Sequence, residues 1–308
     1  MQVYSGSSSA IAIPPCALTI GNFDGVHLGH QAMLAHLREA AHRRGLPTAL
    51  LTFEPLPREL FTPLDPPARL TTLRDRLARL KAIGLVDYVI VQRFNRAFAA
   101  LSPQAFIEKI LCQQLHTRYL LIGDDFRFGA KREGDFGLLA AQPSFETEAM
   151  PTLALEGERV SSSLVRQALQ QGDLVLAKCL LGADYQISGR VIHGKKLGRT
   201  LGFPTANVNL LHRKPALQGV FVVEAETTFG CLRGVASLGL NPTVTSAISP
   251  RPDYHLEVHF FDFAEDLYGQ RITVRFLSKL RDEEKYDSIE QLVAQITRDA
   301  AAARAFFH

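Results

Sequence analysis

The apolar pattern of the chain changes once, near residue 182, and this change constrains the fold more than any other feature. Before it, short apolar runs alternate with segments whose apolar residues recur every three or four positions. "CALTI" (16–20) and "PTALLTF" (47–53) are predicted strands, and the helical segment between them places Leu34 and Leu37 on one face. Strand, helix and strand in this order form the unit of a parallel sheet. The repeated alternation predicts a doubly wound α/β domain.

The remaining elements follow the same two periodicities. In the first part, further helices are predicted at 69–84, 102–115 and 162–181, and further strands at 87–94, 118–123 and 151–157. In the second part, short strands follow one another and are predicted at 185–192, 219–227, 231–239, 254–263 and 271–278. Since no amphipathic helix separates these later strands, they indicate a closed antiparallel β-barrel, with one helix at 288–307 ending the chain.

Length and composition limit the classes of protein to consider. A chain of 308 residues is long for one hydrophobic core, so two domains are expected, at 1–183 and 184–308. The net charge of +3, from 34 basic and 31 acidic residues, is too even for a protein that coats nucleic acid. The four scattered cysteines form no C-x-x-C pair, and no apolar run is long enough to span a membrane. With no signal-peptide pattern at the N-terminus, the sequence predicts a cytoplasmic protein without membrane or nucleic-acid partners.

The turn "GNFDGVHLGH" (21–30) concentrates residues with special chemistry between a strand and a helix. In a doubly wound sheet, ligands bind beyond the carboxyl ends of the strands, and this turn lies at such an end. Glycines at 21, 25 and 29 allow a tight turn, and the helix start offers N–H groups to a phosphate. His27 and His30 are one helical turn apart, so both can stabilise charge on a polyphosphate. The alternatives are a plain turn with two surface histidines, or a zinc pair, which lacks an evident third ligand.

A second glycine-rich segment, "GKKLGRTLGFPTAN" (194–207), opens the predicted barrel. It lacks the spacing of a Walker A loop. Gly194, Gly198 and Arg199 nevertheless suit a basic loop over ATP phosphates. Taken alone, the segment favours a basic hairpin turn over an ATP site. Further along, Glu257 lies in an alternating strand, and the alternation leaves open whether it faces solvent or a site.

Five segments in order carry a resemblance to a known family. "GNFDGVHLGHQ" resembles the signature of the nucleotidylyltransferase superfamily and, within it, that of the bacterial bifunctional riboflavin kinase/FAD synthetase family. "LIGDDFRFGAKREGD" (121–135) and "VSSSLVRQAL" (160–169) resemble the second and third motifs of this family. "GKKLGRTLGFPTANV" and "LEVHFFDFAEDLYGQ" resemble its kinase half. The resemblance runs nearly end to end and implies an N-terminal FMN adenylyltransferase domain and a C-terminal riboflavin kinase domain.

In the first domain, the resemblance implies that FMN attacks the α-phosphate of ATP and that pyrophosphate leaves. His27, His30 and Arg166 would then stabilise the developing charge, as imidazoles and a planar donor suited to phosphate. The expected nucleotide-binding residues are Gly21, Asn22, Phe23, Asp24, Gly25, Ser162 and Ser163. Asp125, Phe126 and Phe128 are expected to hold the flavin substrate, although a turn with two core rings explains the phenylalanines equally well.

In the second domain, the resemblance assigns Thr205 and Asn207 to Mg²⁺ and the nucleotide, because neutral oxygen ligands plus phosphates suit Mg²⁺. Glu257 matches the family's catalytic base, which deprotonates the terminal hydroxyl of riboflavin. The implied substrates are riboflavin, FMN, FAD and ATP, and both steps are expected to need Mg²⁺. One alternative is a related nucleotidylyltransferase with another acceptor and a barrel that only binds. Another is an RNA partner, since H-x-G-H also occurs in class I aminoacyl-tRNA synthetases.

Overall fold

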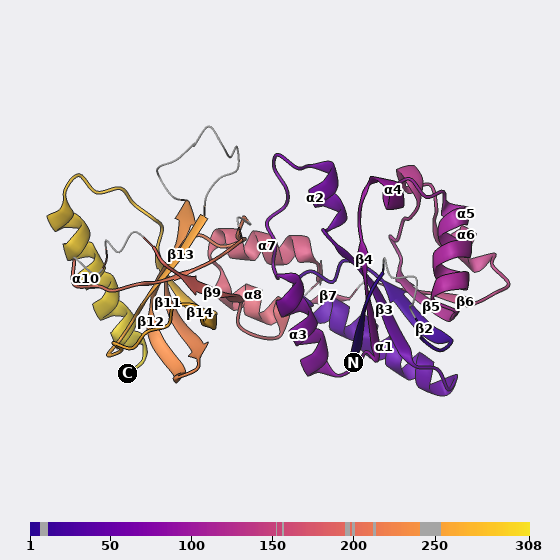
Figure 1. Cartoon of the computed structure of the whole chain (residues 1–308), viewed down its shortest axis with the longest axis horizontal. Coiled ribbons are helices and arrows are strands. Elements are labelled where there is room, and N and C mark those ends of the chain that lie inside the picture. Colours follow the sequence, from indigo (N-terminus) through magenta and orange to yellow (C-terminus); the bar gives the residue numbers. More distant parts are fainter. Residues whose placement is uncertain are drawn as a thin grey trace. The chain divides into compact units, whose positions relative to one another are not determined.

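The chain folds into two compact units (Figure 1). The computed structural model describes residues 1–6, 12–151, 153–155, 157–194, 198, 201–211, 214–240 and 254–308. The first unit comprises Met1–Pro67 and Leu73–Ser161, and the second comprises Ala68–Thr72 and Ser162–His308. None of the helices in the described ranges is both long and apolar enough to cross a membrane.

The first unit is built on a six-stranded sheet in the order β1-β4-β3-β2-β5-β6, with every neighbouring pair parallel. Its strands are β1 (Gln2–Ser5), β2 (Cys16–Ile20), β3 (Thr48–Glu54), β4 (Tyr88–Arg93), β5 (Thr117–Gly123) and β6 (Glu146–Met150). The strand order reverses between β2 and β5, which makes the carboxyl ends of these two strands the topological switch point of the sheet.

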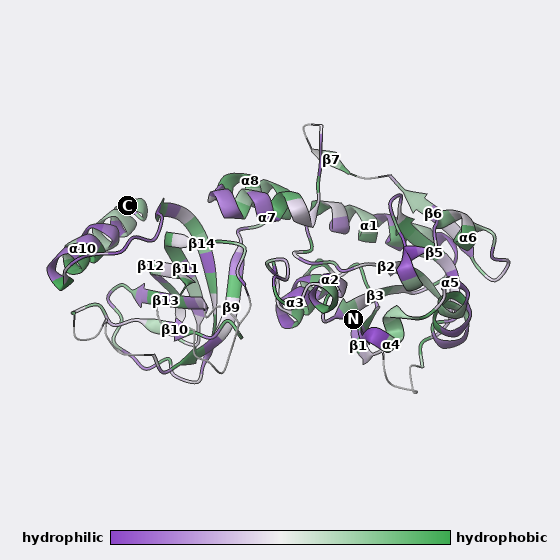
Figure 2. Ribbon diagram, turned by 90° about the horizontal axis from the view of Figure 1, so that it is seen from above, coloured by the Kyte–Doolittle hydropathy of each residue, from purple (hydrophilic) through white to green (hydrophobic). Residues whose placement is uncertain are grey.

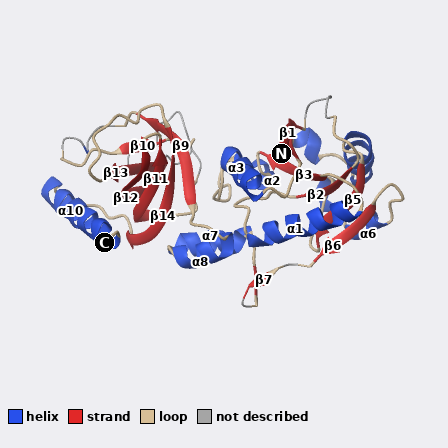
Figure 3. Ribbon diagram, turned by 90° about the horizontal axis from the view of Figure 1, so that it is seen from below, coloured by secondary structure: helices blue, strands red, loops and turns tan. Residues whose placement is uncertain are grey.

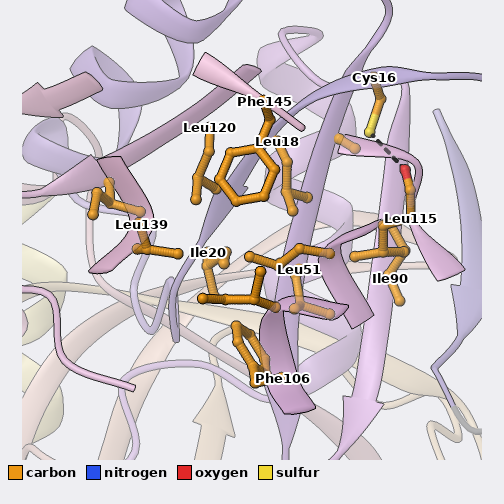
Figure 4. Close-up of a cluster of buried hydrophobic side chains, with 14 of the residues drawn as sticks. Cys16, Leu18, Ile20, Leu51, Ile90, Phe106, Leu115, Leu120, Leu139 and Phe145 are labelled. Carbon is orange, nitrogen blue, oxygen red and sulfur yellow. Dashed lines mark hydrogen bonds between the residues drawn. The ribbon is translucent and has the colours of Figure 1, made fainter. Parts of the chain in front are cut away.

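Helices cover both faces of this sheet. They are α1 (Leu28–Arg43), α2 (Pro57–Phe61), α3 (Leu73–Ile83), α4 (Arg96–Ala99), α5 (Pro103–Ala105), a π-helix (Phe106–Gln114), a 3₁₀ turn (Ala130–Arg132) and α6 (Phe136–Ala140). The strands are continuous apolar runs. Because successive residues of a strand point to opposite faces, each run places apolar side chains on both faces of the sheet. Leu18 and Ile20 pack toward the π-helix (Figure 4), whereas Leu50 and Val89 pack toward α1 and α3.

The second unit combines a closed barrel with helices (Figure 3). Neighbouring strands around the barrel are all antiparallel, in the order β10-β13-β12-β11-β14-β9. The strands are β9 (Gln186–Ile192), β10 (Ala206–Val208), β11 (Gly219–Thr227), β12 (Gly230–Leu240), β13 (Tyr254–Phe260) and β14 (Arg271–Arg281). The helices are α7 (Ser162–Gln171), α8 (Leu174–Leu181) and α10 (Ile289–Phe306).

Helix α10 carries both hydrophilic and hydrophobic residues (Figure 2), and its apolar side packs on the barrel. Ala300 and Ala303 form a buried cluster with valines of β11 and β12. An ion pair joins α10 to the end of β14, where Arg281 donates to Asp299 with a shortest distance of 2.7 Å. Both side chains are largely buried, at 19% and 8% exposure. The helix is therefore held by apolar packing and by a shielded charge pair.

The predicted fold class is confirmed, and several elements differ from prediction. The sixth strand is Glu146–Met150, whereas 151–157 contributes only to a small hairpin of β7 (Ala154–Leu155) and β8 (Glu158–Arg159). The helix predicted at 162–181 is two helices. Gly172 adopts a left-handed φ of 76° and Asp173 then caps α8, accepting a hydrogen bond from the backbone N–H of Leu176. Strands β1 and β10 were not predicted, since each is only three or four residues long.

Candidate active sites

The turn that follows β2 lies at the switch point of the first sheet and has a strained backbone. Gly25 has a φ of 83°, and Phe23 and Val26 also have positive φ, at 50° and 45°. Positive φ is uncommon for non-glycine residues and most unfavourable for a β-branched one. The side chains of Phe23 and Val26 are fully buried in the cluster between the sheet, α1 and α3. Packing of these two side chains thus holds a turn that the backbone alone would not prefer.

The two predicted histidines are brought together by this turn. The rings of His27 and His30 stack with centroids 3.7 Å apart, and the Phe23 ring lies 4.4 Å from that of His30. His27 is the N-cap of α1, where its Nδ1 accepts a hydrogen bond from the backbone N–H of His30 at 3.4 Å. A neutral His27 ring therefore carries its proton on Nε2, where it is a hydrogen-bond donor. A side chain at Gly29 would press on the His27 ring and on the carbonyl of Val160, which explains glycine there.

His30 is half-buried and lies beside positively charged groups. Its Nδ1 is buried and has no hydrogen-bond partner in the part of the chain that the structure describes. Burial, then the nearby His27 and Arg76, hold the pKa of His30 well below its ordinary value. His30 is therefore neutral at physiological pH. The alternative of a plain turn with two surface histidines does not fit this geometry, because His27 is only 5% exposed.

Arg76, on α3, is a residue that the sequence analysis missed. Its side chain is 1% exposed and lies against the turn, with Nη1 donating to the carbonyl of Asn22 at 2.5 Å. Its Nη2 donates to the carbonyl of Phe53 and to the carboxylate of Glu54, both at 3.2 Å. The signal was present in the sequence, because an arginine three residues after Leu73 and four before Leu80 occupies the apolar register of this helix.

The second motif follows β5, next to β2 in the sheet. Asp125 is exposed and forms an ion pair with Arg159 at 2.8 Å. Phe128 is 6% exposed and belongs to the core, with its ring against Gly134, where any side chain would collide with it. Phe126 is half-buried and stacks on Phe128 with centroids 5.8 Å apart. Of the two rings, only Phe126 thus combines core contact with partial exposure.

A series of aromatic rings, also missed by the sequence analysis, continues from Phe126 and Phe128. Consecutive centroids are 5.4 to 6.1 Å apart along this series. Its further members are Phe106, Phe98, Phe53, Phe94 and Phe61. Phe53 and Phe94 stand at the carboxyl ends of β3 and β4, and Phe61 is 66% exposed. Phe53 and Phe94 are the last residues of two predicted strands, and this placement was a usable signal.

The third motif lies in the second unit. Helix α7 begins at Ser162, which is half-buried, whereas Ser163 is exposed. Arg166 is half-buried, and its Nε donates to the carbonyl of Ala68 at 2.6 Å. The guanidinium of Arg166 is thus oriented by a backbone acceptor within its own unit.

The predicted residues of the barrel form a compact cluster. The hydroxyl of Thr205 donates to Oε2 of Glu257 at 3.3 Å, and Asn207 pairs directly with Glu257 across β10 and β13. The neighbours Leu256 and Val258 are buried, so Glu257 lies on the outer face of the barrel wall and is half-buried. His259, two residues further on that face, has Nδ1 2.9 Å from the carbonyl of Pro204.

Two of the predicted glycines pack against this cluster. A Cβ at Gly194 would collide with the side-chain amide of Asn207. A Cβ at Gly198 would collide with the carbonyl of Phe203, close to Thr205. Both positions therefore require glycine because the loop backbone approaches Thr205 and Asn207 closely. Arg199, the basic residue predicted in this loop, lies outside the described residues.

A polar network beside Glu257 was not predicted. Ser237 pairs directly with Glu257 across β12 and β13, and its hydroxyl donates to Glu283 at 2.8 Å. His255 Nε2 is 3.1 Å from the same carboxylate. Burial opposes ionisation of Glu283, but hydrogen bonds from His255 and Ser237 hold the pKa of its carboxyl below the usual value. The segment after β14 is thus tied to the same face of the barrel as Glu257.

The donor sets of the two sites differ in chemistry. Within the described ranges, no group of three or more His, Cys, Asp or Glu side chains could hold a metal ion. The hydroxyl of Thr205 and the side-chain oxygen of Asn207 are hard neutral donors, the kind that Mg²⁺ shares with substrate phosphates. They fit a magnesium–nucleotide complex, whereas the histidine pair of the first unit offers N–H donors.

Comparisons with known proteins agree on both halves of the chain. The family model for FAD synthetase matches residues 11–164, and that for riboflavin kinase matches residues 181–307. A curated relative from Haemophilus influenzae, named bifunctional riboflavin kinase/FMN adenylyltransferase, is 46% identical over the whole of both chains. A relative of the same name from Escherichia coli is 48% identical over 95% of this chain and 93% of its own.

A solved structure shares the fold nearly end to end. It is named a macrolide-efflux protein from Streptococcus pneumoniae and superposes with a TM-score of 0.82, at 32% identity, over 98% of each chain. That printed name differs from the names of the curated relatives, which are more similar in sequence to this chain. The structural match supports the fold. The family models and the curated relatives support the two activities.

Proposed function

The chain belongs to the family of bifunctional riboflavin kinase/FMN adenylyltransferases, and we propose how its residues divide the two reactions. The enzyme phosphorylates riboflavin with ATP to give FMN, and it transfers the adenylyl group of a second ATP to FMN to give FAD and pyrophosphate. One observation carries the division: each family model covers one of the two side-chain clusters. We place the domain boundary at 183, beyond the FAD synthetase match of 11–164 and close to residue 181, where the riboflavin kinase match begins.

In the adenylyltransferase half, we assign the turn from Gly21 to His30 to the phosphates of ATP. The N–H at Nε2 of His27 and the stacked, neutral His30 supply donors where negative charge develops on the leaving pyrophosphate. The backbone of Asn22, Phe23, Asp24 and Gly25 approaches the nucleotide because the turn is tight and starts a helix. Ser162, Ser163 and Arg166 keep the roles predicted from their motif, as hydroxyl and guanidinium donors to phosphate.

The aromatic series supports a place for the flavin in the same half. An isoalloxazine ring is flat and largely apolar, so it gains most from stacked or edge-on aromatic neighbours. We propose that Phe126, partly exposed and backed by Phe128, contacts this ring. Asp125 keeps its predicted substrate role at the rim, where its carboxylate can accept hydrogen bonds once the ion pair with Arg159 opens.

In the kinase half, we assign Glu257 as the general base. A primary hydroxyl is a weak nucleophile until its proton is accepted, and Glu257 is a half-buried carboxylate beside the Thr205 hydroxyl. We propose that Thr205 and Asn207 hold Mg²⁺, which when bound neutralises phosphate charge. Gly194, Gly198 and Arg199 form the loop over the phosphates. The collisions that a side chain would cause at either glycine support a closely apposed loop.

The other candidate functions lose their support. A nucleotidylyltransferase with another acceptor would leave the riboflavin kinase match of residues 181–307 unexplained. An RNA-binding synthetase would leave both family matches unexplained. We also propose a cytoplasmic location, where thiols stay reduced, because all four cysteines are free.

A single reaction mixture tests the proposal. The protein is incubated with riboflavin, ATP and Mg²⁺, and the flavins are separated by chromatography at intervals. We expect FMN first and FAD later, and removal of Mg²⁺ with EDTA should stop both steps. If FMN forms at an undiminished rate without a divalent cation, the Thr205–Asn207 assignment is wrong. If riboflavin is converted to FMN and no FAD forms, the N-terminal half does not catalyse the proposed adenylyl transfer.

A further inference from the structure

Arg76 is buried without being part of either predicted motif. Its side chain is 1% exposed, while Glu54, which it meets at 3.2 Å, is 24% exposed. Burying a guanidinium is costly unless it is paired and hydrogen-bonded, and here Nη1 and Nη2 reach the backbone of two different segments. One is the carbonyl of Asn22 in the phosphate turn and the other is the carbonyl of Phe53 at the end of β3. The side chain thus clamps the turn to the carboxyl end of the neighbouring strand.

Two side chains donate hydrogen bonds to the backbone carbonyl of Asn22. The carbonyl of Asn22 accepts hydrogen bonds from Arg76 at 2.5 Å and from the hydroxyl of Thr52 at 3.1 Å. The next residue, Phe23, has a positive φ of 50°, and its ring stacks on His30. The orientation of this peptide therefore decides where the Phe23 ring lies, and the ring in turn packs against the histidine pair.

Arg76 also supplies a permanent positive charge beside His30. Burial and the neighbouring His27 and Arg76 hold the pKa of His30 well below its ordinary value, so His30 is neutral. An arginine stays charged at every physiological pH. The other titratable groups of this region are Asp24 in the turn, which is buried, and Glu54 on β3. Glu54 offsets part of the positive charge of Arg76, but this charge still acts on His30, whose pKa it helps to lower. A positive charge behind the turn favours an incoming polyphosphate.

We propose that Arg76 is a positioning residue for adenylyl transfer, which fixes the Asn22–Phe23 peptide under the two histidines and places a permanent positive charge behind them. The inference rests on the assignment of the histidine pair to the ATP phosphates. It explains why an arginine is buried at position 76, which the assignments of the two active sites do not.

The test uses the full-length enzyme with Arg76→Gln and Arg76→Lys. Arg74→Gln is the matched control, since Arg74 is exposed on the same helix. We expect Arg76→Gln to lower kcat for FAD formation from supplied FMN by about 10²-fold, the scale of a small misplacement of reacting groups. Arg76→Lys should lower this kcat less, because lysine keeps the positive charge although it lacks the two terminal nitrogens of the guanidinium. The riboflavin kinase rate of the same samples should stay at the level of the control.

Two further readouts separate positioning from general damage. In histidine-selective NMR titrations, His30 should gain its proton at higher pH in Arg76→Gln than in Arg76→Lys, because only the first variant removes the charge. Thermal melting of all variants shows what fraction is folded at the assay temperature. The proposal is overturned if Arg76→Gln forms FAD at the native rate, or if its loss only follows the unfolded fraction while His30 titrates unchanged.

The proposed function fails in a different way. If His27→Ala and His30→Ala both form FAD normally, the assignment of the turn is wrong and the role of Arg76 falls with it. If these histidine variants are impaired and Arg76→Gln is not, only the inference about Arg76 is wrong.

Discussion

Replacing Glu257 with glutamine isolates the base of the kinase reaction with little change in shape. The two side chains have the same length, and the glutamine oxygen can still accept the hydrogen bond that Thr205 donates to Glu257 at 3.3 Å. Among the described residues, Glu257 takes part in no ion pair that the change would break. Its flanking residues Leu256 and Val258, which hold the strand in the barrel wall, are untouched. The variant should therefore fold and bind riboflavin as the native enzyme does.

The expected loss is large because glutamine cannot accept a proton. A correctly placed general base contributes about 10²–10⁴-fold to a rate. At about 1.36 kcal/mol for each factor of ten, the activation barrier should rise by about 2.7–5.4 kcal/mol. Because the base acts only as the hydroxyl attacks, kcat should carry almost all of this loss, and KM for riboflavin should change little.

The assay measures FMN formation from riboflavin with Mg-ATP, by chromatography of the flavins. FAD formation from supplied FMN in the same sample is an internal control, because it belongs to the other domain. Glu226→Gln is the matched variant, as it removes the same charge from an exposed position on β11. The reasoning is refuted if Glu257→Gln turns over within a factor of about three of Glu226→Gln, since a base is worth at least about 10²-fold. Glu257 would then be an ordinary residue of the barrel's outer face.

Three other changes test separate parts of the structure. His27→Ala should lower FAD formation by about 10²–10³-fold and spare FMN formation, whereas the exposed His42→Ala on the same helix should change neither in the flavin assay. Arg166→Lys should impair FAD formation, because an ammonium cannot reproduce planar, two-pronged donation to phosphate, and a native rate would show that only its charge matters. Asp299→Ala should lower the free energy of unfolding by about 3–5 kcal/mol in denaturant titrations, since it strands a buried arginine. Asp262→Asn, which removes one charge of an exposed pair and keeps a residue type that tolerates the left-handed φ of 54°, should cost at most about 1 kcal/mol, and equal losses would contradict this account.

The fold was predictable where the periodicity is long and unbroken. The strands at 16–20 and 47–53 are apolar on both faces, which is what a sheet covered on both sides demands. The predicted position of the sixth strand was wrong, because the residues of the actual strand are mostly polar. The sixth strand, Glu146–Met150, contains two glutamates and a threonine, so its composition does not resemble a buried strand. It joins the sheet at an edge, where one flank lacks a neighbour and burial is incomplete.

The parts of the candidate sites that contain closely spaced glycines and histidines were predictable from the sequence. The H-x-G-H spacing brings His27 and His30 into ring contact, as one helical turn requires. What the sequence could not supply is contact between segments far apart in the chain. Arg76 is 54 positions from Asn22, and Glu283 is 46 positions from Ser237, and only the folded sheets bring each pair together. No local pattern encodes such contacts, so they appear only once the topology is known.

The two clusters differ in a way that follows from their acceptors. Riboflavin offers a hydroxyl, which must lose a proton to attack, and the barrel provides Glu257. FMN offers a phosphate, which is already ionised near neutral pH because its second pKa is about 6. Adenylyl transfer therefore needs no base, and the turn after β2 provides donors and a buried cation instead of a carboxylate poised to accept a proton. FAD formation should therefore fall as the pH drops through about 6, where the phosphate dianion of FMN is protonated to the monoanion.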